Sequence, residues 1–111
     1  MKVIDFSEIQ IKAYIDKIRP PKELRSQVDV SCSYKNNTFE IFEIRPNWAD
    51  KNIIQNLPIA KAKYVKTKKT WSVYWMTSNE KWILYKPKPR VEKLSDFIEL
   101  LVKDENGCFW G

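Results

Sequence analysis

The chain of 111 residues contains no histidine, and it has only two glycines and two cysteines. Without histidine the commonest general base is missing, so Ser-His-Asp and Cys-His catalysis are excluded. Cys32 and Cys108 lie far apart and form no metal-ligand spacing. We expect two thiols in a reducing compartment, with a single disulfide as the alternative. The sequence therefore predicts no metal, no other cofactor and no catalytic residue.

Long apolar runs are also missing. No stretch approaches the roughly 18 apolar residues that would span a bilayer. The first ten residues, MKVIDFSEIQ, carry acids where a signal peptide would be apolar. We therefore expect a cytoplasmic protein without a membrane segment. An apolar content of 43% over this length is enough for one ordinary hydrophobic core, so residues 1–111 are predicted to form a single domain.

Positive charge is present in excess, and it is concentrated in one segment. The chain has a net charge of +6, and residues 59–90 hold nine Lys or Arg against a single acid, Glu80. Three Trp and three Tyr are interleaved with these cations. A local basic field with aromatic side chains is typical of proteins that bind nucleic-acid backbones.

The hydrophobic periodicity predicts an α+β fold. A first helix is expected from Ser7 to the residues before Pro20, with Ile11, Tyr14 and Ile15 on its apolar side. Alternating patterns then predict a hairpin of residues 27–35 and 38–45, a short helical turn capped by Asp50, strands at 59–65, 70–77 and 81–86, and a helix at 92–104. The expected architecture is an antiparallel sheet of about five strands (two plus three), with the N-terminal and C-terminal helices packed on one face.

Two points of register stay open in this pattern. Phe42 and Ile44 fall on the face opposite the predicted core, so either both faces are covered there or a β-bulge intervenes. The second point is the length of the loop after Val65. A four-residue loop places Ala60 and Ala62 on the face of the Trp side chains, whereas a five-residue loop exchanges the two faces of that strand.

The four-residue loop is favoured, because the alternative would bury Lys61 and Lys63 beside three Trp side chains. With a turn at Ser78-Asn79, Trp71, Trp75 and Trp82 are expected to share the core face. The opposite face then carries lysines together with tyrosines. The candidate nucleic-acid-binding residues are Lys61, Lys63, Lys66, Lys68, Lys69, Tyr74, Lys81, Tyr85, Lys86, Lys88 and Arg90.

The expected partner of this surface is DNA or RNA, bound through phosphates and stacked bases. Two alternatives remain: a lysine-rich sheet that is merely solvated, and an interaction or scaffold module for an acidic protein. The oligomeric state is not determined by the sequence. A more remote hypothesis is a metal-dependent nuclease, because Asp29 and the Glu43-Ile44-Arg45 segment resemble a carboxylate pair that could hold Mg²⁺. The competing interpretation is a structural ion pair between Glu43 and Arg45.

Several segments resemble one family in order along the chain. They are Glu43-Ile44-Arg45-Pro46 with Trp48, residues 58–65, residues 71–75, Lys81-Trp82 with Tyr85 and Pro87, and the final residues 107–111. On these segments the chain resembles the uncharacterised bacterial domain-of-unknown-function family 3024. The residue after Trp82 is often His in that family, and Ile83 stands there in this chain. The resemblance implies a small, free-standing bacterial domain and no particular activity.

Overall fold

The computed structural model describes the backbone of residues 5–110 and the side chains of residues 8–110. The expected cap at Ser7 lies outside the described side chains. The elements are α1 (Asp5–Ile18), a short 3₁₀ helix (Lys22–Leu24), β1 (Asp29–Lys35), β2 (Thr38–Pro46), β3 (Ile54–Val65), β4 (Thr70–Met76), β5 (Trp82–Leu84), β6 (Arg90–Val91) and α2 (Leu94–Lys103). Among the described residues, no helix is both long and apolar enough to cross a bilayer.

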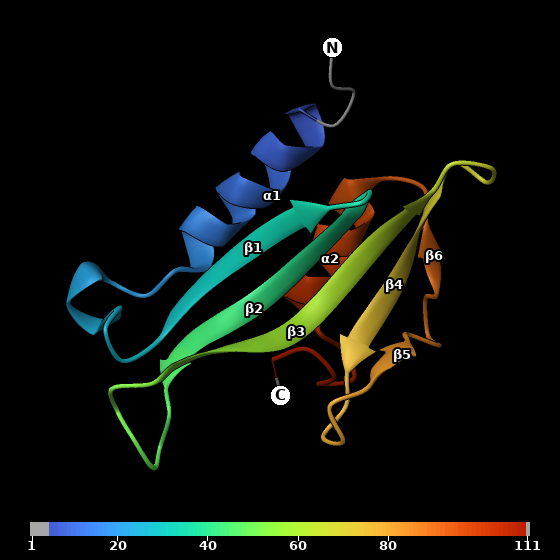
Figure 1. Cartoon of the computed structure of the whole chain (residues 1–111). Coiled ribbons are helices and arrows are strands. Elements are labelled where there is room, and N and C mark those ends of the chain that lie inside the picture. Colours follow the sequence, from blue (N-terminus) through green and yellow to red (C-terminus); the bar gives the residue numbers. More distant parts are fainter. Residues whose placement is uncertain (1–4, 111) are drawn as a thin grey trace.

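The sheet is antiparallel throughout, and its strands follow the order β1-β2-β3-β4-β5. Strands β5 and β6 pair with the same edge of β4: β6 pairs with Trp71 and Ser72 near its start, and β5 pairs with residues 74–76 near its end. In Figure 1, α2 lies behind the sheet, α1 runs along the outer side of the edge strand β1, and the face toward the viewer is uncovered. The predicted α+β class is confirmed. We call the uncovered side the open face.

The core lies between the sheet and the helices. Helix α1 contributes Ile11 and Ile15, which are 0% and 5% exposed, and α2 contributes Phe97 and Leu101 at 0% and 1%. Their spacing is the one that puts side chains on a single side of a helix. Phe109 follows α2 and is also buried, because the Asp104 carboxylate accepts hydrogen bonds from the backbone N–H groups of Phe109 and Trp110 at 3.1 and 2.9 Å.

The first hairpin has the predicted turn and register. Asn36 and Asn37 both adopt positive φ, at 53° and 59°, as a two-residue turn between twisted strands requires. Tyr34 faces Phe39 across the strands, with ring centroids 4.5 Å apart. A β-bulge does intervene, but it lies in β3: the register between β2 and β3 shifts after Ile41, so that Phe42 pairs with Pro58. The pairing of β2 with β1 is continuous, so Phe42 and Ile44 stay on the face opposite Ile41, where both are partly buried.

The helical turn predicted around Asp50 is wrong. Residues 47–53 form a loop, and β3 begins at Ile54, five residues before the expected start at Ile59. The Asn47 side chain accepts hydrogen bonds from the backbone N–H groups of Ala49 and Asp50, at 2.7 and 3.2 Å. This local bonding satisfies the backbone groups that a helix would otherwise pair.

The four-residue loop after Val65 is confirmed, since Val65 pairs with Thr70. Ala62 therefore shares the core face with Val73, and both are 0% exposed. Trp71 lies on the same face at 6% exposed. The lysines of β3 consequently point to the open face, as expected.

The turn between β4 and β5 differs from the prediction by one residue. Met76 rather than Trp75 pairs with Trp82. The turn includes Glu80 at a positive φ of 59°, and it is closed by the Thr77 N–H donating to the Lys81 carbonyl at 3.0 Å. A one-residue shift exchanges the faces of a strand, so the prediction that Trp82 is a core residue is wrong. Trp82 lies on the open face.

Candidate nucleic-acid interface on the open sheet face

The open face carries a row of cations that crosses the whole sheet. Lys35 pairs with Thr38, Thr38 with Lys63, Lys63 with Ser72, and Ser72 with Arg90. Cross-strand partners lie on the same face, so the three cations point to the same side. Neighbouring strands lie about 4.8 Å apart, so the four steps from Lys35 to Arg90 make the row about 19 Å long. All three cations are exposed.

The β3–β4 loop extends this row at the same end of the sheet (Figure 1). Its lysines are Lys66, Lys68 and Lys69, all exposed. We call the combined group the basic end: Lys35, Lys63, Lys66, Lys68, Lys69 and Arg90. Among the described residues, the ion pairs involve Arg19, Arg45 and Lys103 and none of the basic end. The positive charge of this end is therefore not neutralised by pairing within the described part of the chain.

The next row toward the sheet centre combines one lysine with two aromatic rings. The Lys61 ammonium lies 4.9 Å from the ring centroid of Tyr74 and 4.6 Å from that of Trp82. Partial burial lowers the pKa of Lys61, and Lys63 lowers it further, while Glu40 across the strand raises it. The contacts with the rings favour the charge that burial disfavours. We call Lys61, Tyr74 and Trp82 the aromatic row.

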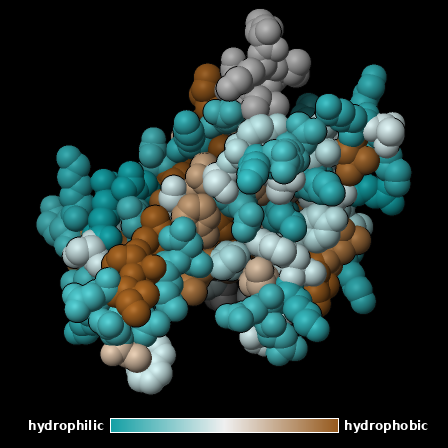
Figure 2. All heavy atoms as spheres, viewed as in Figure 1, coloured by the Kyte–Doolittle hydropathy of each residue, from teal (hydrophilic) through white to brown (hydrophobic). Residues whose placement is uncertain are grey.

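The far end of the open face is apolar. Phe42 and Ile44 on β2 lie beside Pro58 and Asn56 on β3. Figure 2 shows brown surface over these ends of β2 and β3, and mostly teal surface toward the β3–β4 loop. In the adjoining loop, Trp48 is 92% exposed. The open face is thus divided along the strands into a basic end, an aromatic row and an apolar end.

The structure brings together only part of the predicted set. Tyr85 is 2% exposed, packs on Phe109 with ring centroids 4.9 Å apart, and accepts a hydrogen bond from the Asn106 amide at 3.0 Å. Its expected place on the lysine face is wrong, because the β4–β5 register shift turns it into the core. Lys81 lies in the turn at the opposite end of β4 from the basic end, and Lys86 lies in the connection from β5 to β6.

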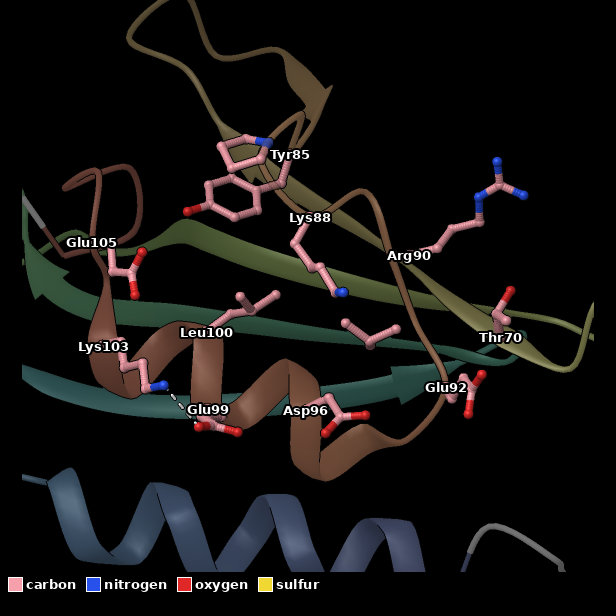
Figure 3. A pocket seen from close by; sticks show the side chains of 12 residues that line it. Thr70, Tyr85, Lys88, Arg90, Glu92, Asp96, Glu99, Leu100, Lys103 and Glu105 are labelled. Carbon is pink, nitrogen blue, oxygen red and sulfur yellow. Dashed lines mark ion pairs between the residues drawn. The ribbon is translucent and has the colours of Figure 1, made fainter.

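Lys88 belongs to a different feature, a groove of about 670 Å³ between α2 and the β5–β6 connection. In Figure 3 its side chain extends toward α2, whereas Arg90 points away from the helix. The opposite wall is acidic but internally engaged. Glu99 pairs with Lys103 at 3.0 Å, and Asp96 accepts the backbone N–H of Lys93 at 3.3 Å. The groove therefore has mixed charge and no strong preference for an anion.

The nuclease hypothesis is not supported by the geometry. Glu43 pairs with Val30, the neighbour of Asp29, so the two carboxylates lie on opposite faces of the hairpin. Asp29 is engaged by the Arg19 guanidinium at 2.9 and 2.7 Å, and this hydrogen bonding lowers the pKa of Asp29. Glu43 and Arg45 form the structural ion pair of the competing interpretation, at 3.4 Å. Among the side chains of residues 8–110, no three His, Cys, Asp or Glu are grouped to hold a metal ion.

The cysteines are not joined to each other, and both are partly buried. Burial raises the pKa of Cys32 and, with the Asp104 charge, that of Cys108. The thiol is therefore the favoured form of each, whereas a nucleophile needs the thiolate. Cys32 packs against the buried cluster beneath the sheet.

Sequence reasoning missed two members of the open face. Lys35 lies outside the basic segment of residues 59–90, and only the pairing of β2 with β3 brings it beside Lys63. Trp82 would lie in the core if the turn were formed by Ser78-Asn79 alone, but the turn is one residue longer. A glutamate with positive φ is uncommon, so the sequence held no strong signal for the longer turn at Glu80.

Comparison with known proteins identifies a family but assigns no activity. No curated protein matches the chain, and no solved structure does. The pattern of one family, described as "Domain of unknown function (DUF3024)", matches residues 4–111, which is essentially the whole chain. The chain therefore belongs to the DUF3024 family.

Proposed function

We propose that the protein binds nucleic acid through the basic end of its open sheet face, as a cytoplasmic protein. The observation that carries the proposal is the pairing that puts Lys35, Lys63 and Arg90 in one row on an uncovered surface. Lysine and arginine side chains neutralise backbone phosphates and release their condensed counterions, which supplies most of the affinity for nucleic acid.

Three features favour this role over a merely solvated surface. The cations of the basic end make no ion pairs among the described residues, so their charge is available to a ligand. The three loop lysines continue the row and widen the field at one end of the molecule. The aromatic row lies directly beside the cations, and Trp82 and Tyr74 offer ring surfaces for stacking.

The test compares two triple variants of equal charge. Lys35→Gln, Lys63→Gln and Arg90→Gln together remove the row, whereas Lys17→Gln, Lys22→Gln and Lys51→Gln remove three exposed lysines elsewhere. Each triple lowers the net charge by the same amount. Binding to 20-nucleotide DNA and RNA is measured by fluorescence anisotropy between about 50 and 200 mM salt.

The row variant is expected to bind more weakly and to have a shallower dependence on salt. The log–log slope should fall by about 0.7 for each single-strand phosphate that the protein no longer neutralises. The control triple should retain most of the affinity of the wild type. Equal weakening in the two triples would show that only total charge matters. No binding by the wild type at the lowest salt concentration would refute the proposal.

A second candidate function is an interaction module for an acidic protein. It is favoured by Trp48, which is 92% exposed, and by the neighbouring Ile53 and Ile54 at 52% and 60%. Exposed Trp side chains next to apolar residues are frequent at the centres of protein interfaces. Poly-glutamate serves as the comparison ligand in the same assay. A preference for poly-glutamate over the oligonucleotides at equal charge would favour this candidate over nucleic acid.

A further inference from the structure

We infer that the ligand of the open face is single-stranded nucleic acid, with its phosphates on the basic end and its bases on the aromatic row. This inference rests on the proposed function and adds the form of the nucleic acid and the manner in which it lies on the sheet. The shape of the surface, the order of its rows and the chemistry around Lys61 carry it.

The width of the surface argues against a duplex. The cation row crosses five strand positions and is about 19 Å long, whereas the major groove of B-DNA is about 12 Å wide and admits a helix or a two-stranded ribbon. Lys35 and Arg90, at the ends of the row, lie at opposite edges of the sheet, so they cannot enter one groove together. The face of a sheet can instead bind a single nucleic-acid strand whose bases are unstacked.

The order of the rows fits a single nucleic-acid strand that lies across the β-strands of the sheet. Tyr74 is two residues along β4 from Ser72, so the first ring lies about 6.7 Å beyond the cation row. Trp82 pairs with Met76, and this places the second ring one further step in the same direction. Phosphates on the row would direct their bases toward these rings, in the way that sheet-binding modules stack two or three bases on aromatic side chains.

Lys61 covers ring surface in the aromatic row that a stacking base would need. Its ammonium lies over both rings, at 4.9 and 4.6 Å from their centroids, and its partly buried position disfavours the charge. A base that stacks on Trp82 would displace this ammonium toward the phosphates of the same strand. Glu40, directly opposite Lys61, could then accept hydrogen bonds from base amino groups.

The test uses three ligands of the same length: a single-stranded 20-mer, its duplex, and an abasic 20-mer that keeps the phosphates but lacks the bases. The wild type is expected to bind the single strand more tightly than either of the others. Trp82→Ala and Tyr74→Ala should each weaken single-strand binding by about 5- to 150-fold, because one stacked base is lost. Neither variant should change binding to the abasic strand by more than about twofold.

Two controls separate stacking from loss of structure. Trp82→Phe keeps a ring and should retain most of the single-strand affinity. Trp48→Ala removes an equally large side chain that is 92% exposed at the apolar end, and it should leave binding unchanged. Far-UV circular dichroism and thermal unfolding establish that each variant is folded before binding is measured.

The outcomes distinguish this inference from the proposed function. Equal affinity for the abasic and normal single strands, or tighter binding to the duplex, would overturn the inference while leaving nucleic-acid binding in place. The inference would also be overturned if Trp82→Ala and Tyr74→Ala bound the single strand as the wild type does. Failure of the wild type to bind any of the three ligands at about 50 mM salt would overturn the proposed function itself.

Discussion

Replacing Trp71 and Trp82 separately by alanine tests the division of the sheet into a core face and an open face. Trp71 is 6% exposed and lies between Phe39 and Tyr64, with ring centroids 5.8 and 5.0 Å away. Removing such a buried ring costs about 3–5 kcal/mol. Trp82 lies on the open face, where alanine removes the interaction with Lys61 and a partly buried ring, at a cost of about 1–2 kcal/mol.

These free energies convert to shifts of the unfolding midpoint. An unfolding entropy of about 2.1 cal/mol/K per residue gives about 0.23 kcal/mol/K for the 111 residues. Trp71→Ala should therefore lower Tm by about 13–21 °C, and Trp82→Ala by about 4–9 °C. Both midpoints are followed by far-UV circular dichroism during heating, with urea unfolding as an independent measure of stability.

Equal losses of stability in the two variants, or a larger loss in Trp82→Ala, would contradict the division of the sheet into a core face and an open face. Small domains are stable by only about 5–15 kcal/mol, so the loss in Trp71→Ala is a large share of the total. Trp71→Phe keeps an aromatic ring in the core and gives a measurable midpoint even where Trp71→Ala does not fold. Its stability should lie between that of Trp71→Ala and that of the wild type.

Two further predictions concern charged groups of the folded protein. Arg19 lowers the folded pKa of Asp29, so the pair stabilises the fold above about pH 4 and this contribution is lost as the pH falls through the lowered pKa. Asp29→Asn should lower Tm by a few degrees at pH 7, and the difference from the wild type should shrink as the pH falls through the lowered pKa of Asp29. For Lys61 the effect of pH is reversed, because burial lowers the pKa of this cation in the folded protein. The partly buried charge destabilises the fold at neutral pH, and the contacts of the ammonium with the two rings partly offset this cost. In urea unfolding at pH 7, the free energy of unfolding of Lys61→Met should be within about 1 kcal/mol of the wild-type value. The stability of the wild type relative to the variant should increase as the pH rises toward 10.5, the ordinary lysine pKa. A markedly less stable variant at pH 7 would show that the ring contacts outweigh the cost of burying the charge.

Most of the fold could be predicted from local patterns. The apolar stripe of α1, the Asn36-Asn37 turn and the four-residue loop after Val65 each depend on neighbouring residues, and each was correct. The failures came where side-chain hydrogen bonding or an unusual backbone angle decided the outcome. Hydrogen bonds to the Asn47 side chain form in place of the predicted helical turn. The positive φ of Glu80 lengthens the turn before β5 by one residue.

The candidate surface was only partly accessible to sequence reasoning. The four-residue loop after Val65 predicts the register of β3 with β4 and so the place of Lys63 on the open face. Arg90 is among the candidate residues, but the expected strands end at residue 86, so the pairing of β6 with β4 that brings Arg90 into the cation row was not predicted. Lys35 required the long-range pairing of β2 with β3, which no local pattern specifies. The one-residue shift at Glu80 then exchanged Trp82 and Tyr85 between the two faces.

The most direct test of the binding face is a ¹H–¹⁵N NMR titration of the labelled protein with a short single-stranded oligonucleotide. Binding through the basic end and the aromatic row predicts shifts of the backbone amides of Lys35, Lys63 and Arg90, in the loop of residues 66–69, and beside Tyr74. Amides of α2 and of the loop around Trp48 should move little. Shifts confined to the groove between α2 and the β5–β6 connection, or spread evenly over every exposed lysine, would contradict it.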